Sequence, residues 1–248
     1  AAAVFVAGGK NSKLIVRPSR SIMSRICIRD ILIRWGPYHG HVPPFSEIPR
    51  PTAQRLSMYL RELDASAAEG HATISSSTIA RAFRITDAQV RRDLACLGQT
   101  GRPGVGYQAA GLARHIRKAL SLDRTWRLAI VGAGKIGTAL MGYPQFAGGS
   151  FQVVAAFDAN PDLYGITVAG VIVRPLDELA TAIHAEKIEL AVLAVPASVA
   201  QDVASQLVAA GIRGILNFAP APLQIDVPVE SIDLSRSLEQ LAFQVSST

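Results

Sequence analysis

The chain has 248 residues, of which 49% are hydrophobic and 18% are charged, so it can form one large globular domain or two modest ones. No apolar run approaches the roughly 20 residues that a membrane-spanning helix needs, and the two cysteines, Cys27 and Cys96, have no metal-ligand spacing around them. We therefore expect a cytoplasmic protein with no membrane association, no disulfide scaffold and no metal.

Charge is distributed unevenly along the chain. Residues 1–47 carry seven Lys and Arg against two acidic residues, residues 48–125 carry twelve against six, and residues 126–248 carry six against eleven. A basic part followed by an acidic part indicates that the basic part contacts a polyanion. An ordinary solvated basic surface would give the same count.

Residues 1–47 show no sustained helical or strand periodicity. They contain a His-Gly-His sequence, His39 to His41, and end near a Pro-Pro pair. We interpret residues 1–47 as an extension that is disordered or not native to the protein, and we expect no metal at the two histidines.

Residues 48–125 predict a small helical domain. The first helix carries an apolar stripe at positions i, i+3, i+4 and i+7, formed by Leu56, Tyr59, Leu60 and Leu63. A second, shorter helix in SSSTIARAFRI turns Ile79 and Phe83 inward.

The third helix starts with a capping signal. Thr86 is followed three residues later by Gln89, which predicts a capping box. The apolar face of this helix is formed by Val90, Leu94 and Leu97. Arg91 and Arg92 must then point away from the core.

Three short helices followed by the Gly-rich segment GQTGRPGVGYQ predict a winged helix-turn-helix. Such a module places its second motif helix in the major groove, where Gln89, Arg91 and Arg92 would reach bases or phosphates. Ser75 and Ser76, at the start of the preceding helix, would donate hydrogen bonds to a phosphate.

The Gly-rich segment predicts a wing. Arg102 gives it the charge to lie along a minor groove. The alternative is a helical docking domain whose arginines form surface ion pairs, with Arg91 or Arg92 paired to Asp87 or Asp93.

A nucleotide-binding turn begins soon after Trp126. The sequence RLAIVGAGKIGTAL reads as strand, turn and helix, with Gly132, Gly134 and Gly137 at the three positions of a GxGxxG motif. The strand FQVVAAFD follows and ends at Asp158, about 20 residues beyond the last glycine. An acidic residue there binds a ribose 2′-hydroxyl and repels a 2′-phosphate, which favours NAD(H) over NADP(H).

The remaining sequence alternates between strands and helices, which predicts a doubly wound Rossmann sheet over residues 126–248. The fold class is therefore α/β with an N-terminal winged helix-turn-helix over residues 48–125. Ligands bind at the carboxyl ends of such strands, where Pro196, Asn217 and Phe218 fall. Ordinary turn chemistry at strand ends is the alternative, but with the glycine motif present Asn217 and Phe218 become candidates for the nicotinamide side.

The sequence contains no obvious catalytic set. A dehydrogenase needs a positioned acid or base, and His71, His115 and His184 all fall where surface residues are expected. We therefore predict that the protein is not an enzyme. The final helix carries Leu238, Leu241 and Phe243, which would pack on a partner subunit or on the helix's own domain.

The order of the motifs QVRRDL, GRPGVGY, VGAGKIGTAL, FDANPDLYG, VPASVAQ, GIRGILNFAP and IDLSRSLEQL closely resembles the Rex family of redox-sensing transcriptional repressors, from about residue 48 to residue 243. The resemblance implies a homodimer that binds a palindromic operator when NADH is scarce and releases it when NADH rises. NADH and NAD⁺ would then act as effectors of a double-stranded DNA-binding protein.

The resemblance also assigns individual residues. It places Gly104 and Tyr107 in the wing, Tyr143 and Asp233 near the nicotinamide, and the last helix in exchange between subunits. Arg61 matches an arginine that pairs with the aspartate at Asp233 across the dimer in one of two states, as an interdomain switch.

Two sets of site residues are expected. The DNA-binding residues are Ser75, Ser76, Gln89, Arg91, Arg92, Arg102, Gly104 and Tyr107. The cofactor-binding residues are Gly132, Gly134, Lys135, Ile136, Gly137, Tyr143, Asp158, Pro196, Asn217, Phe218 and Asp233.

Several positions depart from the family pattern. Pro103 stands where the wing arginine is common, Leu163 stands where many members have lysine, and Leu234 follows Asp233 where some members have phenylalanine. Two other classes of protein share parts of the pattern, an NAD-dependent oxidoreductase and a CoA-binding domain protein. Asp158 argues against the second, because it suits a dinucleotide ribose.

Overall fold

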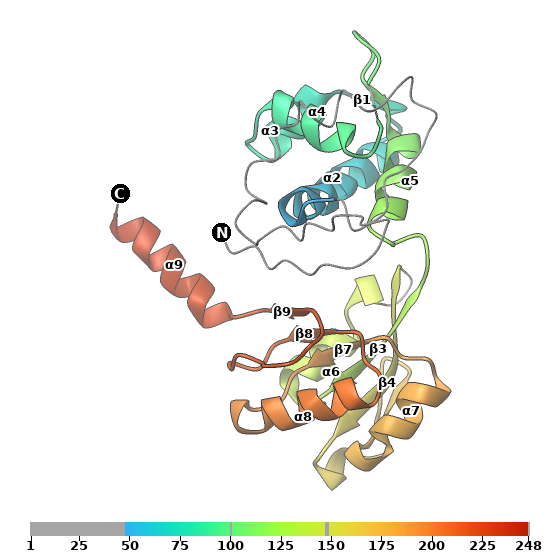
Figure 1. Ribbon diagram of the computed structural model, residues 1–248, viewed down its shortest axis with the longest axis vertical. Coiled ribbons are helices and arrows are strands. Elements are labelled where there is room, and N and C mark those ends of the chain that lie inside the picture. The colour runs from blue at the N-terminus through green and yellow to red at the C-terminus, as the bar shows by residue number, and fades with distance from the viewer. Residues whose placement is uncertain (1–47, 100, 147–148, 248) are drawn as a thin grey trace, which may run out of the picture.

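The computed structural model describes residues 48–99, 101–146 and 149–247, and the extension predicted for residues 1–47 lies outside them. The described chain forms a helical N-terminal lobe and a C-terminal lobe built on a parallel sheet, and the last helix extends away from both lobes (Figure 1). The predicted fold class is confirmed.

Among the described residues, four helices build the N-terminal lobe around one hydrophobic cluster. They are α2 (Arg50–Ala68), α3 (Ser76–Ala82), α4 (Asp87–Ala95) and α5 (Ala109–Ala119). The stripe predicted for the first helix is buried in this cluster, together with Ile79, Val90, Leu94 and Leu97. Each large apolar side chain that is buried in this way contributes roughly 1.5–3 kcal/mol, so α2 is a firm support for the two shorter helices.

Side chains cap both helices of the helix-turn-helix. Ser75 Oγ accepts a hydrogen bond from the N–H of Thr78 (3.0 Å) at the start of α3, and Thr86 Oγ1 accepts one from the N–H of Gln89 (3.2 Å) at the start of α4. The capping box predicted at Thr86 is only half formed. The Gln89 side chain turns toward Asp93 instead of returning to the Thr86 backbone.

The wing is a tight turn rather than a long hairpin. Arg102 and Gly106 form an isolated bridge with two backbone hydrogen bonds of 2.8 and 2.9 Å. Beyond it, the short strands β1 (Thr73–Ile74) and β2 (Tyr107–Gln108) pair antiparallel. Only glycine fits at Gly106, because φ is +87° and an added Cβ would lie 2.4 Å from the Ile74 carbonyl oxygen.

Within the described part of the C-terminal lobe, seven strands form a sheet in the order β5-β6-β4-β3-β7-β8-β9. They are β3 (Trp126–Val131), β4 (Phe151–Asp158), β5 (Thr167–Val168), β6 (Val171–Pro175), β7 (Leu190–Leu193), β8 (Gly214–Asn217) and β9 (Val229–Ser231). All neighbouring strands are parallel except the β5–β6 hairpin. From β6 onward this is the strand order of a doubly wound dinucleotide-binding fold, whose ligand crevice lies where the order reverses, beyond β3 and β7.

Helices cover the two faces of the sheet unequally. On one face, α7 (Leu179–Ala185) and α8 (Ala197–Ala209) pack on the alternate residues that include Ala129 and Val131. On the other face, α6 (Lys135–Met141) packs where Leu128 and Ile130 point. Short 3₁₀ turns complete the lobe at Pro144–Phe146 (η2), Pro161–Leu163 (η3) and Leu176–Glu178 (η4).

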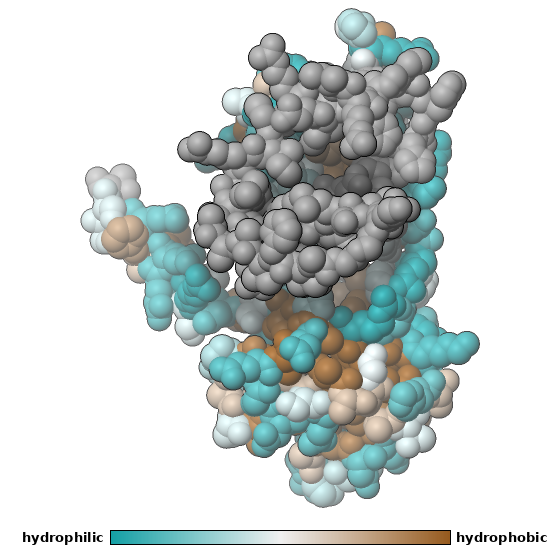
Figure 2. All heavy atoms as spheres, viewed as in Figure 1, coloured by the Kyte–Doolittle hydropathy of each residue, from teal (hydrophilic) through white to brown (hydrophobic). Residues whose placement is uncertain are grey.

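An apolar groove of about 640 Å³ lies on the α6 side of the sheet, over the strands that α6 does not cover. Its apolar residues include Leu128, Phe146, Phe151, Leu190, Val192 and Leu216. It also borders Arg50 and Glu230, which form an ion pair (2.6 Å) between α2 and β9. Figure 2 shows hydrophobic residues gathered on the side of the C-terminal lobe that faces the N-terminal lobe.

The last helix, α9 (Leu234–Ser246), has no buried residue. Leu238, Leu241 and Phe243 are 67%, 55% and 71% exposed. Of the two packing arrangements that the sequence left open, the described chain therefore does not show α9 packed on its own domain. The helix projects away from both lobes (Figure 1).

Candidate nucleic-acid interface and dinucleotide site

The exposed face of α4 carries the side chains predicted to contact DNA. Arg91 and Arg92 are both exposed, as the periodicity of the helix requires. Arg91 forms an i, i+4 ion pair with Asp87 and approaches Ser76 Oγ (3.5 Å) at the start of α3. This surface pair is one that the docking-domain alternative predicted, and exposed pairs of this kind contribute little to stability.

The serines of the neighbouring helix start are already hydrogen-bonded to one another. Ser75 Oγ lies 2.8 Å from both Ser77 Oγ and Thr78 Oγ1. Ser76 is the first residue of α3 and lies beside Arg91. The structure therefore brings Ser76 and Arg91 together on one surface, while Ser75 chiefly caps the helix.

The three wing residues expected to contact DNA lie in different environments. Arg102 and Gly104 lie at the exposed tip of the wing, where Gly104 has φ +74°. Tyr107 is only 9% exposed, and its ring packs in the core of the lobe close to Gly101. Burial raises the pKa of Tyr107. The structure thus places the Tyr107 ring at the base of the wing, and its contact with DNA stays a prediction.

The glycine turn has the spacing that a dinucleotide site requires. At Gly132, φ is +96° and an added Cβ would lie 2.3 Å from the Ala194 carbonyl oxygen. At Gly137, an added Cβ would lie 1.8 Å from the Gly132 carbonyl oxygen. At Gly134 an added Cβ would meet no atom within 4 Å, so this position alone of the three opens on free space. The residues fit a group that approaches the backbone at Gly134, as a pyrophosphate does.

The opening lies at the start of α6, and Tyr143 follows the other end of that helix. Gly134 is the N-cap of α6, so the first N–H groups of the helix, from Lys135 and Ile136, have no partner within the helix. Both side chains are exposed. Tyr143, 46% exposed, packs edge-on against Phe146 with ring centroids 5.5 Å apart.

Asp158 holds the glycine turn in place. Its Oδ2 accepts a hydrogen bond from the N–H of Ala133 (2.6 Å) and its Oδ1 accepts one from the N–H of Asn160 (2.8 Å). A carboxylate therefore lies at the end of β4 and directly beside the turn, where the sequence predicted it.

The neighbouring strand ends supply backbone rather than side chains. Pro196 is exposed at the start of α8, and Phe218 is half-buried, with its N–H donating to the Leu193 carbonyl oxygen (2.8 Å). Asn217 is fully buried. Its Nδ2 donates to Ala221 O (2.9 Å) and its Oδ1 accepts from the Ala219 N–H (3.0 Å). The Asn217 amide therefore fixes a turn, and a ligand at this edge would meet the backbone.

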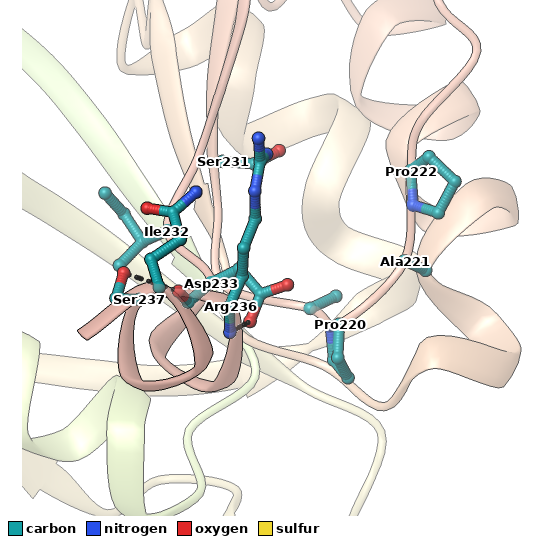
Figure 3. Close-up of a pocket in the computed structure, with 10 residues that line it drawn as sticks. Pro220, Ala221, Pro222, Ser231, Ile232, Asp233, Arg236 and Ser237 are labelled. Carbon is teal, nitrogen blue, oxygen red and sulfur yellow. Dashed lines mark hydrogen bonds between the residues drawn. The ribbon is translucent and has the colours of Figure 1, made fainter. Parts of the chain in front are cut away.

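A second pocket, of about 530 Å³, lies where β9 meets α9. Figure 3 shows Asp233, Arg236 and Ser237 on one side of it and Pro220 and Pro222 on the other. Asp233 caps α9 through a hydrogen bond from the Arg236 N–H (3.0 Å). Arg61 is exposed on α2, and no ion pair joins it to Asp233 within the part of the chain that the structure describes.

Sequence reasoning missed one polar cluster. Arg55, Tyr59 and Asp93 form a buried network between α2 and α4. The available signal was polar residues at helical spacing on the buried side of α2, where Arg55 precedes Tyr59 by four positions and Thr52 precedes Arg55 by three. Asp93 is therefore not a surface partner of Arg91 or Arg92.

Two absences hold for residues 48–99, 101–146 and 149–247. No group of three or more His, Cys, Asp or Glu side chains could hold a metal ion there. No helix in these ranges is long and apolar enough to cross a membrane. His39 and His41 lie outside the described residues.

The sequence is similar to proteins of known class. Residues 47–95 match the family described as putative DNA-binding protein N-terminus, and residues 123–221 match the CoA binding domain family. The redox-sensing transcriptional repressor Rex of Carboxydothermus hydrogenoformans is 42% identical over 201 residues, which are 80% of this chain and 97% of the relative. Rex 1 of Thermotoga maritima is 38% identical over 80% of this chain and 96% of its own length.

Solved structures of a Rex-family repressor, RSP, share the fold. RSP in complex with β-NAD⁺ and operator DNA is 33% identical in sequence and has a TM-score of 0.77. The match covers 81% of this chain and 93% of the RSP chain. RSP in complex with β-NADH is 32% identical, with coverage of 81% and 95% and a TM-score of 0.74.

A winged helix-turn-helix joined to a doubly wound sheet with a glycine turn defines a DNA-binding protein with a dinucleotide-binding domain. The relatives identify the particular family within this class. The chain belongs to the Rex family of redox-sensing transcriptional repressors.

Proposed function

We propose that this protein is a transcriptional repressor that senses the ratio of NADH to NAD⁺. It binds a palindromic operator when NADH is scarce and releases the operator when NADH is bound. The observation that carries the proposal is the presence, in one chain, of an outward-facing arginine pair on α4 and a glycine turn that opens at Gly134. The solved complexes of RSP with operator DNA and with NADH support it.

The N-terminal lobe, residues 48–125, would contact the operator. Arg91 and Arg92 on α4 enter the major groove, Ser76 lies beside them, and Arg102 at the wing tip approaches a minor groove. The lobe carries twelve Lys and Arg against six acidic residues, which favours a polyanionic partner.

The C-terminal lobe, residues 126–248, would hold the dinucleotide. The open backbone at Gly134 and the first N–H groups of α6 suit a pyrophosphate. Asp158 suits the adenosine ribose, and Tyr143 and Asp233 are proposed to lie near the nicotinamide. The nicotinamide ring, cationic in NAD⁺ and neutral in NADH, supplies the redox signal when bound.

A homodimer explains two apolar surfaces that the described residues leave exposed. The exposed stripe of α9 and the groove over β7 and β8 are both apolar. We propose that α9 of each subunit packs on the groove of the other, which also pairs two α4 helices for a palindrome. A repressor of this kind acts in the cytoplasm, with the DNA it regulates, and needs no catalytic residue.

The experiment is a fluorescence-anisotropy titration of the full chain. The probe is a labelled duplex that the wild-type protein selects from a randomised library, at fixed salt, alone and with NADH, NAD⁺ or CoA. We expect NADH to release the duplex at concentrations where NAD⁺ and CoA do not. If CoA alone releases the duplex, the effector is wrong. If no duplex is selected, the regulator proposal is wrong, and turnover with nicotinamide cofactors becomes the next assay.

A further inference from the structure

The buried polar cluster between α2 and α4 has at its centre a carboxylate on the helix that would read DNA. Asp93 is 2% exposed. Arg55 donates to it through Nε (2.7 Å, to Oδ2) and Nη2 (2.7 Å, to Oδ1), and the Tyr59 hydroxyl donates to Oδ2 (2.7 Å). This forked contact ties α4 to α2 in one rotational setting about the α4 axis.

The same carboxylate reaches the exposed face of α4 through Gln89. Gln89 Nε2 donates to Asp93 Oδ1 (2.9 Å), and Gln89 Oε1 accepts from Arg92 Nη2 (2.8 Å). An ionised carboxylate can only accept hydrogen bonds and a guanidinium can only donate them. The Gln89 amide therefore has a single orientation that satisfies both neighbours, with its oxygen toward Arg92.

Asp93 stays ionised in this setting. Burial by itself raises the pKa of Asp93, but the hydrogen bonds from Arg55, Tyr59 and Gln89 outweigh it and hold that pKa below its usual value. Because Asp93 is enclosed, it cannot touch DNA itself, and any effect on recognition must pass through Gln89 and Arg92.

We infer that Asp93 is a positioning residue for DNA recognition, which sets the direction of the Gln89–Arg92 pair on the exposed face of α4. The inference rests on the proposed operator binding by that helix. The Arg92 guanidinium, held at Nη2 by Gln89, presents its remaining N–H groups as a planar fork. A fork of this kind matches the O6 and N7 acceptors of guanine in the major groove. Arg92 is therefore a reader of guanine, and Asp93 keeps it aligned.

The test is the effect of Asp93→Asn on base discrimination. Asparagine has the same shape but places an N–H₂ group against donors on Arg55, Tyr59 or Gln89. The selected duplex and copies in which each guanine is replaced singly are titrated with the full-length wild type, Asp93→Asn, Arg92→Ala and the double variant, with a poly(dA-dT) duplex as the non-specific competitor. We expect Asp93→Asn to lower discrimination at one guanine by about tenfold and to leave non-specific affinity and its salt dependence unchanged, because no phosphate contact is lost.

The double variant separates positioning from general destabilisation. If Asp93 acts through Arg92, then Asp93→Asn causes no further loss of discrimination once Arg92 is alanine. If the same factor is lost in both backgrounds, or if specific and non-specific affinity fall together, the inference is wrong. A wild type that selects no duplex contradicts the proposed function instead.

A second variant decides the matter if Asp93→Asn does not fold. Arg55→Lys keeps the positive charge on α2 but loses the forked contact to Asp93, and Arg55 lies outside the recognition helix. Reduced discrimination at the same guanine supports the inference, with circular dichroism confirming an intact fold. Unchanged discrimination overturns it.

Discussion

At the scale of single residues, the glycine turn separates a folding requirement from a binding requirement. Gly137→Ala would place a Cβ 1.8 Å from a backbone oxygen, whereas Gly134→Ala would meet nothing within 4 Å. We expect Gly137→Ala to destabilise the protein by about 1–3 kcal/mol or more. Gly134→Ala should leave stability within about 1 kcal/mol of wild type and weaken NADH binding. Urea unfolding and NADH fluorescence titrations measure the two effects, and equal stability of both variants would contradict this account of the turn.

Asp158 carries the predicted preference for NAD(H) over NADP(H). Its carboxylate is fixed beside the turn by the Ala133 and Asn160 N–H groups, so its charge has a defined position. Asp158→Asn keeps the size and an acceptor oxygen but removes the charge that repels a 2′-phosphate. We expect the ratio of NADH to NADPH affinity to fall by about tenfold, about 1.4 kcal/mol. An unchanged ratio, measured by isothermal titration of both cofactors, would show that specificity lies elsewhere.

Asp93 also makes stability depend on pH. Its pKa is lower in the folded protein than in the unfolded chain, so the unfolded chain takes up a proton first as the pH falls. The stabilisation is therefore complete at neutral pH and is lost as the pH falls below about 4, through the pKa of the folded state. We expect the Tm of the wild type to drop more steeply from pH 6 to pH 3 than that of Asp93→Asn. Parallel curves would show that the ion pair with Arg55 contributes no such dependence.

At the scale of helices and strands, α9 carries an exposed apolar stripe that is suited to packing against another subunit. Leu234, Leu238, Leu241 and Val245 recur at helical spacing on one exposed stripe, while Glu239 lies on a different face. We expect Leu238→Asp with Leu241→Asp to convert a dimer into a monomer and to weaken operator binding. The control, Glu239→Lys, should do neither. Sedimentation velocity measures the assembly, and a monomeric wild type would contradict the proposed exchange of α9.

Elements with clear periodicity were predictable from sequence, and short or buried polar features were not. The α2 stripe, the Thr86 side-chain cap and the GxGxxG turn follow from local chemistry that the structure confirms. The two-residue strands β1 and β2 are too short to show a period. Tyr107 is buried against residues far along the chain, Asn217 is held by hydrogen bonds within its own turn, and Gln89 turns toward Asp93, and a periodic pattern indicates none of these.

At the scale of the whole molecule, α2 connects the two sites. It holds α4 through Arg55 and Asp93, and its N-terminal Arg50 pairs with Glu230 of β9, three residues before Asp233. The segment between α5 and β3, residues 120–125, is held in place as well. Trp126 Nε1 donates to the Ser121 carbonyl oxygen (2.7 Å), and Arg124 donates two hydrogen bonds to Glu189 (3.0 Å each). The contacts of α2 therefore include residues of both lobes.

The family resemblance implies a switch between Arg61 and Asp233, and we propose it for this chain. A charge pair that forms across the dimer in only one of two states shifts the balance between them by its own free energy, about 1.5–3 kcal/mol for hydrogen bonds between charged groups. We expect Arg61→Ala and Asp233→Asn each to shift the NADH concentration for half-release of the duplex by about tenfold in the same direction. The double variant should shift it no further, because both changes remove the same pair.

The control is Arg50→Ala, which removes an exposed ion pair and should therefore shift the NADH concentration for half-release by a smaller factor. Additive shifts in the anisotropy titration would show that Arg61 and Asp233 act independently and that the signal takes another path through α2.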